Sequence, residues 1–309
     1  MIGDFKQLMA HARALPTKVI ALVHPAGAES FRAVGEALGA LPVRFLLAGN
    51  EELIRAGMER EGVGGDAPLE ILPAGSPAES ARLAVTAARE GRADILMKGS
   101  VDTGGLLREV LREEGGLRMG RLLSDIVILE YAPRQGNRFL MITDGGVTLA
   151  PDLRNKMDLV RNAVELAHAL GNPEPRVAVL SATEFVLPDL PSTLDAAALA
   201  KMNERGQIRG CLVDGPLALD NALSAEAAKE KGITSAVAGR AEILVAPNIE
   251  AANALAKGTT YFGGLLLAHV IVGGRVPVLI PSRADGSEAR LLSMALGMVM
   301  SEHTQREES

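Results

Sequence analysis

Three residues with charged or hydroxyl side chains lie within four positions near the C-terminus. Ser282, Arg283 and Asp285 directly follow the apolar run VPVLIP, residues 276–281. A guanidinium can hold a phosphate in a forked geometry, a carboxylate can act as a general base, and a hydroxyl can donate to a developing oxyanion. Ligands of open α/β sheets bind outside the carboxyl ends of strands, where this segment is expected. By itself, however, so short a segment is better explained by an aspartate that caps the last helix and pairs with Arg283.

A second polar and basic group is expected at residues 97–125. The strand-like run ADILMKG comes before the glycine-rich segment SVDTGG, and a helix is expected to begin near Thr103. A helix N-terminus favours binding of phosphate, because it presents unpaired N–H groups and the positive end of the helix dipole. The alternative is an ordinary turn with Ser100 or Thr103 as the helix cap. The concentration of basic residues in an acidic chain favours an anion site, which we assign to Lys98, Gly99, Ser100, Thr103, Arg108 and Arg121.

Further polar residues follow other predicted strands. Asp144 ends the run RFLMITD, and two glycines after it allow close approach of the backbone. We assign Asp144 to substrate binding. Each of the others can line a cleft or form a turn; they are Ser181, Glu184, Asp214 and Asp220.

Composition excludes several classes of function. Aromatic residues make up 3% of the 309 residues and the net charge is -6, which argues against base stacking and against a basic field for nucleic acid. The five histidines lack metal-ligand spacing, so no metal site is expected. The single cysteine, Cys211, is expected to be buried in mid-strand, and a reducing cytoplasm fits its lack of a partner. The apolar stretch 261–281 contains His269, Arg275 and Pro277 and predicts a buried helix and strand, not a membrane span.

The elements that must position these residues alternate along the chain. Short apolar runs alternate with helical patterns, which predicts βαβ units and a parallel sheet. The expected strands of the first part are 18–23, 43–49, 69–73 and 93–99, with helices at 28–39, 50–61 and 76–91. The runs 124–131 and 138–146 are expected to pair as an antiparallel hairpin.

The second part of the chain continues the alternation. A helix is expected at 152–170, strands at 176–182, 206–215, 241–247 and 276–281, and a last helix at 286–301. We predict a two-domain α/β protein with mostly parallel sheets flanked by helices. Residues 1–133 plus 271–309 form the first domain, and residues 134–270 form a second, inserted domain. The cleft between the domains is the expected site.

Several segments together resemble the phosphate acetyl/butyryl transferase family. The similar segments are MKGSVDTGGLLREVL, GLRMGRLLSDIVILE, DGGVTLAPDL, GQIRGCLVDGPLALDNALS and VPVLIPSRADGSEARLLSMAL. They occur in the same order from about residue 17 to residue 300. VDGPLALDNA and SRAD are the most specific, and they fit the butyryl-type branch better than the acetyl-type branch.

The resemblance implies an exchange of acyl-CoA and inorganic phosphate with acyl phosphate and CoA. It also implies a fold of the isocitrate/isopropylmalate dehydrogenase type and a homodimer or larger oligomer. Coenzyme A enters as a substrate, and no permanently bound cofactor is expected. A thiol with a pKa near ~8.5 is mostly protonated at neutral pH, so a base helps it attack the acyl carbonyl directly in a ternary complex.

The resemblance assigns roles within that reaction. Asp285 is the expected base and Ser282 the expected oxyanion donor, while Arg283, Arg108 and Lys98 bind the phosphoryl group. In acetyl-type members the corresponding carboxylate lies further along, which leaves Glu288 as the alternative base.

Other functions remain open at this point. A metal- and nicotinamide-dependent decarboxylating dehydrogenase has the same fold, but it needs aspartates clustered on one helix face, and no such pattern occurs here. A phosphate acyltransferase that uses acyl carrier protein, and a non-catalytic sensor of CoA or acyl phosphate, are both compatible with the sequence. Acetyl, propionyl, butyryl and branched chains are all possible because one methylene changes selectivity by only about 1–3 kcal/mol.

Overall fold

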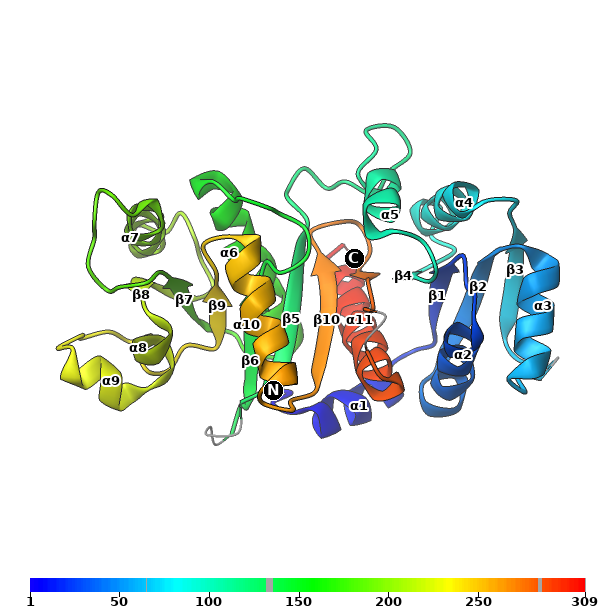
Figure 1. Cartoon of the computed structure of the whole chain (residues 1–309), viewed down its shortest axis with the longest axis horizontal. Coiled ribbons are helices and arrows are strands. Elements are labelled where there is room, and N and C mark those ends of the chain that lie inside the picture. The colour runs from blue at the N-terminus through cyan, green and yellow to red at the C-terminus, as the bar shows by residue number, and fades with distance from the viewer. Residues whose placement is uncertain (65, 132–135, 283–284, 309) are drawn as a thin grey trace. The chain divides into compact units, whose positions relative to one another are not determined.

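The computed structural model describes residues 1–64, 66–131, 136–282 and 285–308. They form two compact units, each with strands and helices (Figure 1). We call Phe5–Arg121 with Ala268–Ser309 the terminal unit, and Met1–Asp4 with Leu122–Leu267 the middle unit. The predicted α/β class with mostly parallel strands is confirmed. The dehydrogenase-type fold and the domain boundaries at 134 and 270 stay predictions.

In the terminal unit, the strand order is β3-β2-β1-β4-β11-β10. Pairing is parallel from β3 to β11 and antiparallel between β11 and β10. After β1 the chain adds β2 and β3 on one side, and β4 lies on the other side. Such a change of side leaves a crevice outside the carboxyl ends of the strands. The strands are β1 (Lys18–Val23), β2 (Val43–Gly49), β3 (Leu69–Pro73), β4 (Ile95–Lys98), β10 (Leu267–Val272) and β11 (Val278–Leu279).

Three helices of the terminal unit begin at residues whose side chains cap them. Asn50, Ser76 and Asp102 accept backbone N–H groups at the starts of α3, α4 and α5. The last helix was expected to end at 301 but continues to Glu308. Lys18, with a side chain 4% exposed, pairs with Glu302 on this extension at 2.8 Å. The helices are α1 (Phe5–Arg13), α2 (Ala28–Ala40), α3 (Glu51–Arg60), α4 (Pro77–Arg89), α5 (Thr103–Val110) and α11 (Ser287–Glu308).

In the middle unit, the strand order is β5-β6-β9-β7-β8. The antiparallel pairing expected between the first two runs is confirmed, and the other pairs are parallel. The strands are β5 (Ser124–Glu130), β6 (Phe139–Thr143), β7 (Arg176–Leu180), β8 (Leu212–Leu217) and β9 (Ile243–Val245). The helices are α6 (Leu153–Ala169), α7 (Pro191–Glu204), α8 (Leu219–Leu223), α9 (Ala225–Glu230) and α10 (Ile249–Tyr261).

The expected strand at 206–215 is wrong in its first half. Gly206 and Gly210 have φ values of 73° and 74°, left-handed backbone that interrupts an extended strand. The Asn203 side chain donates to the carbonyl oxygens of Ile208 and Cys211, which holds this segment as a loop. Cys211 is buried as expected, but it precedes β8 and does not lie within it.

Within the described ranges, no helix combines the length and the apolar character that crossing a membrane requires.

Candidate active site

A cavity of about 480 Å³ lies at the carboxyl ends of β1, β4 and β11 in the terminal unit. This is the crevice expected where the chain changes sides of the sheet. Its polar part comes from the first turns of α2 and α11, from the end of β4, and from the loops after β4 and after β11. The polar side chains are Glu29, Ser30, Lys98, Ser100, Ser282 and Arg290.

The turn after β4 lies against the end of β1. The N–H of Gly99 donates to the carbonyl oxygen of Val23 at 2.9 Å, and the N–H of Ser100 donates to that of His24 at 2.9 Å. A Cβ atom on Gly99 would lie 2.4 Å from the Val23 oxygen, so only glycine permits this approach. The turn thereby brings Lys98 and Ser100 to the cavity.

The remainder of the predicted anion group lies elsewhere. Asp102, and neither Ser100 nor Thr103, caps α5, because its carboxylate accepts the N–H of Gly105 at 2.7 Å. Thr103 is the first residue of the helix and Arg108 is exposed in its last turn. These two residues and the half-buried Arg121 are not among the residues that line the cavity.

Two hydrogen bonds join Asp285 to Ser282. The carboxylate of Asp285 accepts the N–H of Ser282 at 2.7 Å, and its own N–H donates to the Ser282 carbonyl oxygen at 3.1 Å. The same carboxylate lies 3.4 Å from Nε2 of His269 on β10. Ser282 lines the cavity. Arg283, the third residue of the predicted group, lies outside the described residues.

Opposing effects act on the Asp285 carboxyl. Burial raises its pKa, but the contact with His269, the Ser282 N–H and the charge of Arg290 together hold the pKa below its ordinary value. The carboxylate is therefore ionised at neutral pH. A lower pKa also makes it a weaker acceptor for a thiol proton.

Arg290 is a cavity residue that the sequence analysis missed. Its guanidinium lies 3.0 Å from the Glu29 carboxylate, and its Nε donates to the Asp285 carbonyl oxygen at 3.2 Å. The side chain is only 12% exposed. The sequence did contain a signal for Arg290, because it lies in the first turn of the predicted last helix. A cation there is disfavoured by the helix dipole and needs a partner from elsewhere in the protein.

In the middle unit, Asp144 organises the turn after β6. It is 2% exposed, and its carboxylate accepts the N–H groups of Asp125, Gly146, Val147 and Thr148 at 2.9–3.2 Å. Burial raises its pKa, and the charge of Asp125 adds to this, while the backbone N–H groups act in the opposite direction. These are the contacts of a turn-forming residue, and its assignment to substrate binding stays a prediction.

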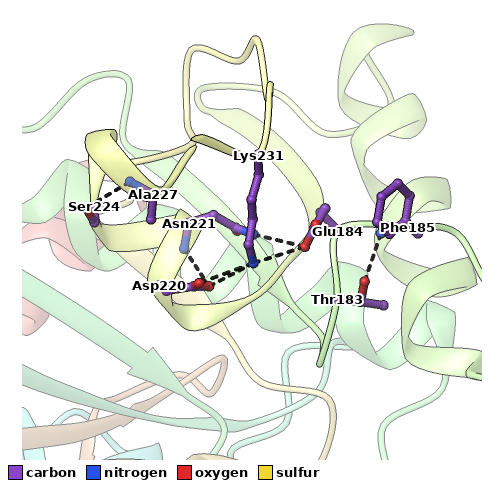
Figure 2. Close-up of polar contacts among 8 residues, drawn as sticks. All are labelled: Thr183, Glu184, Phe185, Asp220, Asn221, Ser224, Ala227 and Lys231. Carbon is purple, nitrogen blue, oxygen red and sulfur yellow. Dashed lines mark hydrogen bonds and ion pairs between the residues drawn. The ribbon is translucent and has the colours of Figure 1, made fainter. Parts of the chain in front are cut away.

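A polar cluster joins two other segments of the middle unit. Figure 2 shows Lys231 between Glu184 and Asp220, 3.2 Å from a carboxylate oxygen of each. The buried Asn221 donates to Glu184 at 3.3 Å, and its own side-chain oxygen has no hydrogen-bond partner among the described residues. Glu184 follows β7, while Asp220 and Asn221 belong to VDGPLALDNA. The cluster therefore connects one of the segments that carry the family resemblance to the loop after β7.

The described residues contain no group of three or more His, Cys, Asp or Glu side chains placed to hold a metal ion. The chemistry available in the cavity of the terminal unit is that of an ammonium, a guanidinium, three hydroxyls and a carboxylate. These groups suit an anionic ligand and proton transfer.

Comparison with known proteins identifies the family. A family model described as phosphate acetyl/butaryl transferase matches residues 76–298. A Bacillus subtilis protein named probable phosphate butyryltransferase is 43% identical over 300 residues, covering 96% of this chain and 98% of its own. A Thermotoga maritima phosphate acetyltransferase is 47% identical over 225 residues, covering 72% of this chain and 75% of its own.

A solved structure agrees with these similarities. It is a branched-chain phosphotransacylase from Enterococcus faecalis, with a TM-score of 0.80 and 30% identity over 93% of this chain and 99% of its own. The relatives are named as acyltransferases, and the matches extend over most of the chain. The chain therefore belongs to the phosphate acetyl/butaryl transferase family and is an acyltransferase.

Proposed function

We propose that the protein exchanges acyl-CoA and inorganic phosphate with acyl phosphate and CoA, acting on short acyl chains and favouring the butyryl type. The observation that carries this proposal is the 480 Å³ cavity, where Lys98 and Arg290 lie beside the hydroxyls of Ser100 and Ser282. The protein has a net charge of -6, so a phosphate ligand needs such a local group of cations and donors.

The start of α2 supports phosphate binding in the same cavity. Gly27, Ala28, Glu29 and Ser30 line it, and Gly27 provides no side-chain cap for the helix. The helix N-terminus therefore presents its positive end to a ligand there. In the proposed complex, Arg283 and Lys98 hold the phosphoryl oxygens, and Arg290 adds a second guanidinium.

The proposed transfer passes directly between the two substrates in a ternary complex. The CoA sulfur gives up its proton and attacks the acyl carbonyl, a carbon–sulfur bond forms, and the carbon–oxygen bond to phosphate breaks. Ser282 donates to the oxyanion of the tetrahedral intermediate. Asp285 receives the thiol proton; its lowered pKa keeps it ionised but weakens it as a base. Glu288, exposed in the first turn of α11, is the alternative base.

The first test measures phosphate-dependent release of free CoA with a chromogenic thiol reagent. Acetyl-, propionyl-, butyryl- and isobutyryl-CoA are compared for the wild type, Arg283→Ala and Arg290→Ala. Arg82→Ala is the matched control, because Arg82 is 58% exposed in a surface ion pair on α4. We expect release that needs phosphate, falls strongly in the first two variants and persists in the control.

A folded protein that releases no CoA from any of the four thioesters would contradict the proposal. Release from acyl carrier protein thioesters instead would favour the carrier-protein enzyme. CoA binding without turnover would favour a sensor.

The assignment of the base has its own test. Asp285→Asn and Glu288→Gln are compared by the pH dependence of kcat/KM in the direction that consumes CoA and acyl phosphate, where the base must be ionised. The variant that removes the acidic limb of the profile identifies the base. We also propose a cytoplasmic homodimer or larger oligomer, whose mass light scattering after size-exclusion chromatography would measure.

A further inference from the structure

We infer that the inner half of the cavity in the terminal unit receives the acyl chain, and that Ala33 and Val34 of α2 limit its length. The inference rests on the proposed acyl exchange and specifies which part of the site selects the substrate.

The cavity changes character from its mouth to its interior. Glu29, Ser100 and Ser282, all exposed, lie at the mouth. The buried part of the apolar lining comes from strands and helices, and its larger side chains and Ala33 are 1–6% exposed: Leu22, Ala33, Val34, Phe45, Met97 and Met294. The cavity thus has one end that can pair with charge and one end that cannot.

A short-chain acyl phosphate has the same polarity. Its phosphoryl group is anionic and its chain is apolar. Burying the phosphoryl group against the apolar lining would leave the charge without partners, which is strongly unfavourable. Burying the amide-containing arm of CoA at the inner end would also be unfavourable, because its amide groups would lose hydrogen bonds to water and find no partners there. The acyl chain is the part of the substrates that the inner end suits.

Two residues of α2 are positioned to set the length of that chain. Ala33 and Val34 line the cavity with side chains smaller than those of Phe45, Met97 and Met294. A larger residue at 33 would occupy space that an acyl chain needs, and a smaller residue at 34 would add space. One methylene in such a pocket changes selectivity by about 10–200-fold.

The test compares kcat/KM for butyryl-CoA and acetyl-CoA in each variant and reports their ratio. The ratio is independent of the fraction of protein that is folded, so a modest loss of stability does not affect it. Ala33→Val and Ala33→Leu should lower the ratio, the latter by about tenfold or more. Val34→Ala should shift the optimum toward longer chains, measured with valeryl- and hexanoyl-CoA.

The matched control is Ala37→Val. Ala37 lies one turn further along α2 and is fully buried, but it does not line the cavity. Its ratio should equal that of the wild type. An equal shift in Ala37→Val and Ala33→Val would mean that general packing of α2 causes the effect, and it would overturn the inference.

Two other outcomes separate this inference from the proposed function. An active wild type whose ratio stays constant in Ala33→Val, Ala33→Leu and Val34→Ala overturns the inference alone. A wild type with no phosphate-dependent release from any thioester overturns both.

Discussion

Replacing Gly99 by alanine should damage both stability and the cavity. The added Cβ would lie 2.4 Å from the Val23 carbonyl oxygen and 2.9 Å from that of His24, where ordinary contacts lie at 3.4–4 Å. Both obstacles are backbone atoms of β1 and its following residue, so no side-chain rotation relieves them. The turn after β4 must therefore move away from β1.

The size of the effect follows from this clash. Overpacking a buried site costs typically about 1–3 kcal/mol, and the rigid obstacle puts Gly99→Ala near ~3 kcal/mol. In a protein of this size each kcal/mol lowers Tm by about 2–4 °C, which predicts a fall of roughly 6–12 °C. A displacement near 1 Å in the turn that carries Lys98 and Ser100 should lower kcat/KM by about 100-fold.

The assay is thermal unfolding with kinetics on the same preparations. Gly39→Ala is the matched control, because its Cβ would meet nothing within 4 Å and it lies in α2 with no left-handed φ. Removing a helical glycine should stabilise the protein by about 0.5–1 kcal/mol. If Gly99→Ala keeps the wild-type Tm and kcat/KM, the close approach of the ends of β1 and β4 does not contribute to stability. The expectation that a Cβ atom at position 99 displaces the turn after β4 is then refuted.

Three further predictions concern stability and reactivity. Lys18→Met should lower the free energy of unfolding by about 2 kcal/mol in urea titrations, because Glu302 loses a charged hydrogen-bond partner at 2.8 Å and, among the described residues, keeps only its ion pair with Arg306; an unchanged midpoint would contradict this. The pKa of Asp285 is lowered in the folded chain, so its ionised form adds stability above its unfolded pKa near ~3.9, and that stability is lost as pH falls through the folded value. Between about pH 5 and pH 2, the free energy of unfolding of Asp285→Asn should therefore fall less than that of the wild type. If the two free energies fall in parallel with pH, the pKa of Asp285 is not lowered in the folded protein. Burial raises the pKa of Cys211 to about 11, with a smaller contribution from Glu174, so the native protein should not react with a disulfide reagent at pH 8 and the unfolded chain should release one equivalent.

Much of the fold could be predicted because its signals are local. The strands at 18–23, 43–49 and 69–73 match β1, β2 and β3 in both bounds, since each is a short, mostly apolar run. The strand expected at 206–215 failed because its first half combines isoleucine and cysteine with two glycines in left-handed backbone. Hydropathy does not register that difference.

The candidate site was predictable only in part. Lys98, Ser100 and Ser282 were assigned from their positions after apolar runs, and all three line the cavity. Thr103 and Arg108 were assigned by closeness in sequence, but α5 carries them away from the cavity. Arg290 was missed because its partner, Glu29, lies 261 residues away along the chain.

By itself, the sequence determined the α/β class, the family and the groups of polar residues that follow the strands. Those properties depend on periodicity and on short segments, which involve neighbours along the chain. Tertiary structure decided which of these residues share a cavity, why position 99 must be glycine, and that His269 and Arg290 lower the pKa of Asp285. These properties depend on distances between segments that are far apart in sequence, and such distances arise only when the strands pair and the helices pack on them.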